Sequence, residues 1–164
     1  MTTTPTESTP SNDALRAQFE ALLDEHRAAL HDSLNGLSEE QARRSLVPSR
    51  TTLLGLVKHV TFVEGVHFDE AITGRSRKEI GIASTPDRSF ILTKSDTIVS
   101  IQTAHRQACE ASRRAAADLH LDDVVSGRGT QPVWRIHLIM LRELAQHCGH
   151  ADILREQILA ARMP

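Results

Sequence analysis

The stretch TTLLGLVKHVTFVEGVHFDE, residues 51–70, has the pattern of a helix with one apolar face. A helix turns about 100° per residue, so residues three or four apart share a face. When His59 is taken as the reference direction, six residues lie within about 60° of it: Thr52, Leu56, Phe62, Val63, Val66 and Glu70. The sequence therefore predicts a long amphipathic helix over residues 51–72 that carries His59 in the middle of its apolar face.

Helical periodicity also recurs on either side of this stretch. It predicts three more long helices, over residues 12–33, 95–119 and 132–161, and a short helical turn that begins after Ser38. Residues 75–93 contain Gly, Pro and charged side chains without a sustained period, so we expect a long connection there. Four long amphipathic helices in one domain predict an all-α protein, a four-helix bundle in which the middle connection is a crossover rather than a tight hairpin.

The composition is that of a globular protein and excludes several classes of function. The 164 residues carry a net charge of −2 and only 3% aromatic side chains, which argues against a nucleic-acid partner. No apolar run approaches the roughly 20 residues that span a bilayer, so no membrane partner is expected. We expect residues 1–11, rich in Thr, Ser and Pro, to be a disordered tail, and residues 12–164 to form a single domain. Cys109 and Cys148 do not form a disulfide framework, which favours a cytoplasmic protein.

The last predicted helix contains ELAQHCGHAD, residues 143–152, with several metal-ligand types close together. Glu143, His147 and His150 fall within about 60° of one another around the helix, on the side of its apolar residues. Ionisable groups on a core face are costly unless they are paired or ligated. With His59 from the facing helix, they could form a catalytic site for Zn²⁺, or for Fe²⁺, Ni²⁺ or Mn²⁺. The alternatives are a hydrogen-bonded core histidine and a Glu143 that pairs with a basic residue.

The two motifs, TTLLGLVKHVTFVE and ELAQHCGHADILRE, resemble the DinB-like superfamily of small bacterial helical proteins, and its branch of thiol S-transferases in particular. The resemblance extends from about residue 14 to residue 160. It implies an up-down-down-up bundle, which agrees with the long middle connection. It also implies a divalent metal, with zinc as the first choice, held by His59 and by two side chains of the last helix. Many members have His-x-x-x-His there, whereas this chain has Glu143 and His147, and His150 could replace Glu143.

Members of this superfamily include enzymes that transfer mycothiol or related thiols to electrophiles. The resemblance therefore implies a metal-dependent enzyme that transfers a low-molecular-weight thiol to a small electrophile through a metal-bound thiolate. The alternatives are a non-catalytic metal-binding or ligand-sensing bundle, and a metal-dependent hydrolase that uses bound hydroxide. Trp134 and Arg142 are candidate substrate contacts. The alternative for Trp134 is that it only packs against its neighbours, and the alternative for Arg142 is that it lies, with His137, on a solvated helix face. The same resemblance favours a homodimer.

Overall fold

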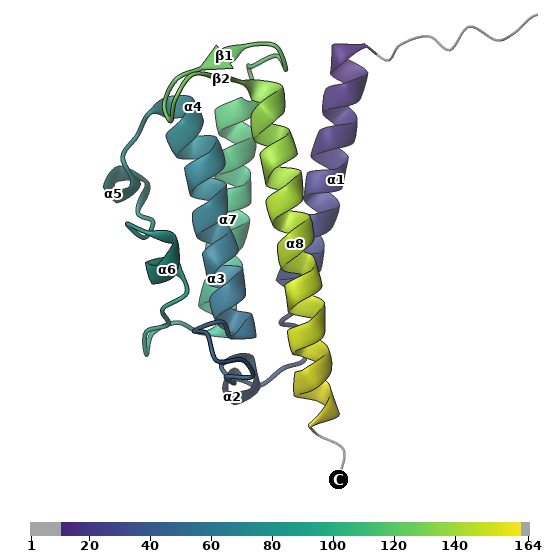
Figure 1. The fold of residues 1–164 in the computed structure, drawn as a ribbon, viewed down its shortest axis with the longest axis vertical. Coiled ribbons are helices and arrows are strands. Elements are labelled where there is room, and N and C mark those ends of the chain that lie inside the picture. The colour runs from purple at the N-terminus through teal and green to yellow at the C-terminus, as the bar shows by residue number, and fades with distance from the viewer. Residues whose placement is uncertain (1–10, 162–164) are drawn as a thin grey trace, which may run out of the picture.

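The chain is mostly helical, as predicted, and the computed structural model describes residues 11–161 (Figure 1). Long helical segments lie side by side: α1 (Asn12–Asp32), α3 (Leu53–Glu64) with its continuations η1 (Gly65–Glu70) and α4 (Ala71–Thr73), α7 (Ile98–Ala116), and α8 (Val133–Ala160). The short helices are α2 (Glu39–Ala42), α5 (Arg77–Ile80) and α6 (Pro86–Ser89). The predicted tail, residues 1–11, lies outside the described residues except for Ser11, whose side chain caps α1.

Hydroxyl side chains cap the first turns of three of the long helices, α1, α3 and α7. Thr52 accepts a hydrogen bond from the Gly55 amide and so starts α3 two residues after the predicted boundary. The helix predicted from residue 95 begins instead at residue 98, because Thr97 and Ser100 form a reciprocal capping box. Before this helix, the Thr93 amide and hydroxyl both donate to the Asp96 carboxylate.

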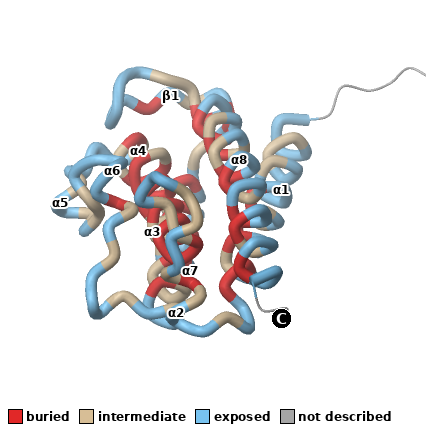
Figure 2. Tube along the Cα trace, turned by 60° about the horizontal axis from the view of Figure 1, so that its bottom comes forward, coloured by how far each residue is buried: buried red, intermediate tan, exposed pale blue. Residues whose placement is uncertain are grey.

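The apolar faces of the long helices meet in one core. α1 packs on α8, and α3 packs on both α7 and α8. Figure 2 shows the buried residues as runs along the inner sides of α3 and α8. The fully buried large side chains on α1, α3, α7 and α8 are Leu23, Leu30, Leu53, Leu54, Leu56, Ile136, Met140, Leu144, Ile158, His105 and His137. α3 is therefore enclosed by neighbours on several sides, which explains why its polar side chains need internal partners.

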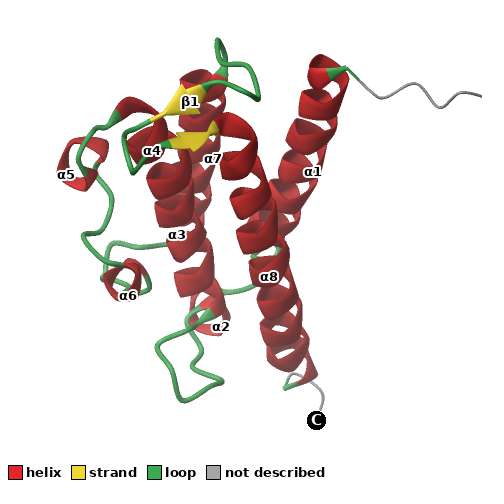
Figure 3. Cartoon of the chain, turned by 45° about the horizontal axis from the view of Figure 1, so that its top comes forward, coloured by secondary structure: helices red, strands yellow, loops and turns green. Residues whose placement is uncertain are grey.

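The connection between α4 and α7, predicted as irregular, contains α5 and α6 and lies along the outside of α3 (Figure 3). Residues 85–91, which we call the strap, are fastened to α3. The Lys58 ammonium donates to the Ile91 carbonyl and to Asp96, at 2.8 Å each. Gly55 permits this close approach, because a Cβ there would lie 3.0 Å from the Phe90 carbonyl oxygen. The strap thus passes over the face of α3 that bears His59, one helical turn after Gly55.

A short hairpin closes the other end of the molecule. β1 (Val124–Val125) pairs antiparallel with β2 (Gln131–Pro132), so the predicted loop before α8 contains two residues of strand on each side. Between the strands, the Gly127 amide donates to the carbonyl of Ala71, the first residue of α4. Across residues 11–161, every helix is too short or too polar to cross a membrane.

Candidate functional site

His59 and His147 lie next to each other between α3 and α8. Their ring centroids are 4.9 Å apart and the rings meet edge to face, at 79°. Both side chains are buried, His59 with 7% and His147 with 8% of the residue surface exposed. The structure thus brings together the two imidazoles that the sequence predicted to share a site.

The strap holds His59 from two directions. Nδ1 of His59 lies 2.6 Å from the Ser89 hydroxyl, and the ring stacks on Phe90 with centroids 4.0 Å apart and an angle of 13°. Burial, reinforced by the neighbouring His147, lowers the pKa of His59 to about 4. His59 is therefore neutral at pH 7, which is the form of imidazole that binds a metal.

His147 is buried without the usual internal bonds. Within residues 11–161, its Nδ1 atom has no hydrogen-bond partner, and its Nε2 atom lies 3.9 Å from a Glu143 carboxylate oxygen. Burial lowers the pKa of His147, although the Glu143 charge opposes this. A buried polar atom without a partner is costly, so His147 is a site at which an additional bound group would be stabilising.

Glu143 lies at the rim of this pair. Arg142 donates to its other carboxylate oxygen at 2.8 Å. Burial alone would raise the pKa of Glu143, but the hydrogen bond and charge of Arg142 outweigh it and hold the pKa below its ordinary value. Glu143 is thus an ionised carboxylate beside two neutral imidazoles.

His150 is not buried, which corrects the expectation that it lies on the core face of α8. Its ring centroid is 5.8 Å from that of His147, and the side chain is exposed. It faces the segment before α3 rather than another long helix, and the buried side of α8 continues past it through Ala151, Leu154 and Ile158. It lines a cavity of about 320 Å³ together with Val47, Ser49, Thr51, Ile153 and Leu154.

The two candidate substrate contacts lie in different places. Arg142 is exposed and adjoins the pair through Glu143. Trp134 is 40% exposed and lies 13 residues before His147, which is about 20 Å along the helix axis. His137, predicted on a solvated face, is instead buried against Phe68, with ring centroids 5.5 Å apart, and its Nδ1 binds the Val133 carbonyl. The prediction failed because the π-helical segment η1 brings Phe68 against this part of α8.

The donor set fits a divalent transition metal in its chemistry but is not gathered around one point. His59 and His147 are neutral and adjacent, Glu143 is ionised, and the Nδ1 atom of His147 lacks a partner. As these side chains stand, however, no three His, Cys, Asp or Glu residues of the described chain converge tightly enough to hold an ion. A third donor would have to turn toward the two imidazoles, and Glu143 could do so by giving up its hydrogen bond with Arg142.

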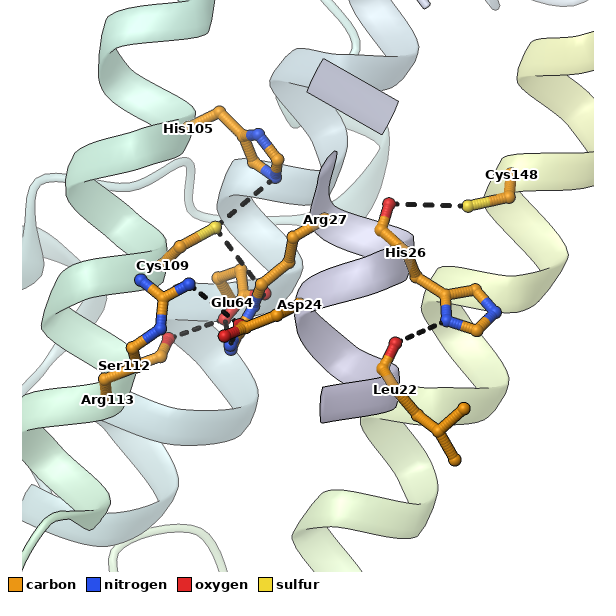
Figure 4. A network of polar contacts seen from close by, with 10 residues as sticks. All are labelled: Leu22, Asp24, His26, Arg27, Glu64, His105, Cys109, Ser112, Arg113 and Cys148. Carbon is orange, nitrogen blue, oxygen red and sulfur yellow. Dashed lines mark hydrogen bonds and ion pairs between the residues drawn. The ribbon is translucent and has the colours of Figure 1, made fainter. Parts of the chain in front are cut away.

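A second polar network lies on another face of α3 (Figure 4). Glu64 is fully buried and accepts hydrogen bonds from Arg27 on α1 and from the Ser112 hydroxyl on α7. Cys109 lies beside it, 3.6 Å from the His105 ring nitrogen. Burial, together with the Glu64 charge, raises the pKa of Cys109 to about 12, so this thiol is not a nucleophile at neutral pH. The network joins three helices and is structural in character.

Sequence reasoning missed Ser89 and Phe90, the strap residues that contact His59. They belong to a segment without periodicity, and neither is a metal-ligand type. The one local signal was Thr85-Pro86, which matches a helix N-cap followed by proline at the first position, and α6 does begin there. That signal locates a turn of helix but does not show what the turn will contact.

A mostly helical fold with two imidazoles buried side by side between its helices defines the class, and it agrees with the resemblance to the DinB-like superfamily. Residues 18–160 match the family model described as mycothiol S-transferase, and the chain belongs to this family, which is part of that superfamily. No curated protein matches the chain.

Proposed function

We propose that the protein is a metal-dependent enzyme that transfers a mycothiol-type thiol to a small electrophile. The family supports the thiol chemistry, and the observation that supports the location is the contact between His59 and His147. We also infer that the long helices form an up-down-down-up four-helix bundle, because the connection through α5 and α6 returns along α3 before α7 begins (Figure 1).

In this proposal His59 and His147 bind the metal, and either Glu143 or His150 completes the ligand set. Zn²⁺ is the first choice and Ni²⁺, Fe²⁺ or Mn²⁺ are alternatives, since two imidazoles and a carboxylate suit any of them. When bound, such a cation supplies positive charge that lowers the pKa of a thiol and so favours the thiolate at neutral pH.

The chain's own residues provide position and surroundings. Ser89 and Phe90 fix the His59 ring, and the apolar core on both sides keeps water away from the two imidazoles. The cavity beside His150 is largely apolar, which suits a small organic electrophile. In the reaction, the thiol S–H bond breaks and its proton goes to solvent, and the sulfur forms the new S–C bond; a leaving group departs with its bonding electron pair or, in an addition, the substrate takes up a proton from solvent.

The test uses the full chain purified without a histidine tag. We expect about one divalent metal per chain, and metal-dependent loss of free thiol when mycothiol and monochlorobimane are added together. His59→Ala and His147→Ala should lose both metal and activity, whereas His120→Ala, at an exposed position, should keep both. Bound metal without thiol consumption would favour a sensor, and ester hydrolysis without thiol would favour a hydrolase; either result contradicts the proposal.

The homodimer and the cytoplasmic location remain predictions. The oligomeric state is measured by light scattering of the same preparation, in which a homodimer would have twice the mass of the 18.1 kDa chain.

A further inference from the structure

Ser89 makes two hydrogen bonds that together determine which nitrogen of His59 carries the proton. The Ser89 hydroxyl lies 2.5 Å from the Pro86 carbonyl oxygen and 2.6 Å from Nδ1 of His59. A carbonyl can only accept, so the single hydroxyl proton of Ser89 is used in the bond to Pro86. The hydroxyl oxygen must then accept from His59, and Nδ1 must be the protonated nitrogen.

We propose that Ser89 is a positioning residue that fixes the His59 proton on Nδ1 and leaves Nε2 with its lone pair free to bind the cation. The inference rests on the proposed function for its chemical purpose, but the proton position follows from the hydrogen bonds alone. An imidazole that binds a metal through one nitrogen commonly donates its other N–H to an oxygen, which fixes both the tautomer and the ring orientation.

The surroundings of Ser89 make the arrangement rigid. Ser89 is almost fully buried and ends α6, a single turn whose N-cap, Thr85, accepts from the Arg88 amide. The next residue, Phe90, lies flat against the His59 ring. The strap therefore restrains His59 through a hydrogen bond at the ring edge and a contact on the ring face, and it leaves Nε2 on the far side of the ring from Ser89.

A solvated neutral histidine side chain prefers the opposite tautomer, with the proton on Nε2. Without the Ser89 hydroxyl, His59 should therefore spend part of its time with Nε2 protonated, and in that state the nitrogen has no lone pair to offer a metal. We expect Ser89→Ala to weaken Zn²⁺ binding about 10- to 100-fold, the range typical of an oxygen partner that orients a metal-ligating histidine.

The first measurement is made on the metal-free, ¹⁵N-labelled full chain at pH 7.5. Long-range ¹H–¹⁵N spectra, with His59 assigned by comparison with His59→Gln, should show a protonated Nδ1 in the wild type and a shift toward protonated Nε2 in Ser89→Ala. A wild-type His59 with its proton on Nε2 would overturn the proposal without any variant.

The second measurement is Zn²⁺ affinity, determined by competition with a chromophoric chelator. Ser89→Thr keeps the hydroxyl and should restore the Nδ1–H tautomer and the affinity, while Ser84→Ala removes an exposed hydroxyl from the same connection and should change neither. Ser89→Ala with wild-type tautomer and affinity would contradict the positioning role. If the wild type binds no Zn²⁺, the proposed function fails, and the tautomer measurement still decides the role of Ser89.

Discussion

The guanidinium of Arg27 on α1 and the carboxylate of Glu64 on α3 form a buried ion pair through two parallel hydrogen bonds. The Nε–Oε1 distance is 2.7 Å and the Nη2–Oε2 distance is 2.9 Å. The Ser112 hydroxyl on α7 adds a third bond to the same carboxylate, at 2.6 Å. Three helices are thus joined at one buried side chain.

Glu64→Gln should destabilise the protein strongly, because the buried Arg27 charge loses its main counter-ion. Breaking one side of a buried pair typically costs about 3–5 kcal/mol. The matched control is Glu20→Gln, which breaks the exposed Arg16–Glu20 pair and should cost less than about 1 kcal/mol. Urea unfolding measures both, and equal small effects would show that the buried pair contributes little.

Glu143 rather than His150 should be the third metal ligand. Glu143 is partly buried and within 3.9 Å of His147, whereas His150 is exposed at the edge of a cavity. We expect Glu143→Gln to weaken Zn²⁺ binding by more than about 100-fold, beyond the range of an indirect partner, and His150→Gln to change it only a few-fold. The reverse order in a chelator competition would assign the ligand to His150.

Gly127→Ala should be destabilising, because a Cβ atom there would meet backbone on two sides. It would lie 2.3 Å from the Glu70 carbonyl oxygen and 2.6 Å from the Gly74 nitrogen. Overpacking of this kind costs about 1–3 kcal/mol. Gly149→Ala is the control, since a Cβ at Gly149 meets open space within α8 and alanine favours helix by about 0.5–1 kcal/mol. Thermal unfolding should shift in opposite directions for the two variants, and a stabilising Gly127→Ala would contradict the packing of the hairpin.

His105 should make the protein less stable in mild acid. Burial lowers its pKa to about 4, the Glu64 charge opposes this, and His31, Arg27 and Arg106 reinforce it. In the unfolded chain the pKa returns to about 6.5, so between these values only the unfolded state binds this proton. Stability contributed by the neutral ring is therefore complete above pH 6.5 and is lost as the pH falls toward 4, by up to about 1.4 kcal/mol per pH unit.

The test of His105 compares how steeply the free energy of unfolding falls as the pH is lowered, rather than the free energy of unfolding at one pH. In urea unfolding from pH 7.5 to pH 4, the free energy of unfolding should fall less steeply for His105→Gln than for the wild type. The control is His120→Gln, a change at an exposed position, which should keep the wild-type slope. Parallel curves for wild type and His105→Gln would show that His105 does not titrate in this window. Other buried histidines, His137 among them, maintain some acid sensitivity in all three proteins.

The helices could be predicted because their apolar periodicity is a local property of the sequence. His59 and His147 were found in the same way, since an imidazole in the middle of an apolar stripe must face the core. His150 was predicted on the same stripe, yet it is exposed, because the buried residues around it on α8 (Leu144, His147, Ala151, Leu154 and Ile158) lie mainly to one side of its direction around the helix. The motifs, rather than periodicity, indicated the DinB-like superfamily and its thiol S-transferase branch, and the match to the mycothiol S-transferase family confirms this.

The strap and the Arg27–Glu64 pair could not be predicted from local patterns. Ser89 meets His59 across 30 residues and Arg27 meets Glu64 across 37, and each contact depends on how separate elements dock. Glu64 illustrates the difficulty, since a glutamate at the end of an amphipathic helix is normally solvated. Only the tertiary structure shows that α1 and α7 enclose it and supply its partners.

Both cysteines of the chain are poor targets for alkylation. Burial, aided by neighbouring carboxylates, raises the pKa of Cys148 to about 11, as it raises that of Cys109 to about 12, so each sulfur keeps its proton in neutral solution. A protein that binds thiol-reactive compounds can be alkylated at its own cysteines. Under the function proposed above, cysteines that keep their protons leave the small-molecule thiol as the group that reacts with the electrophile.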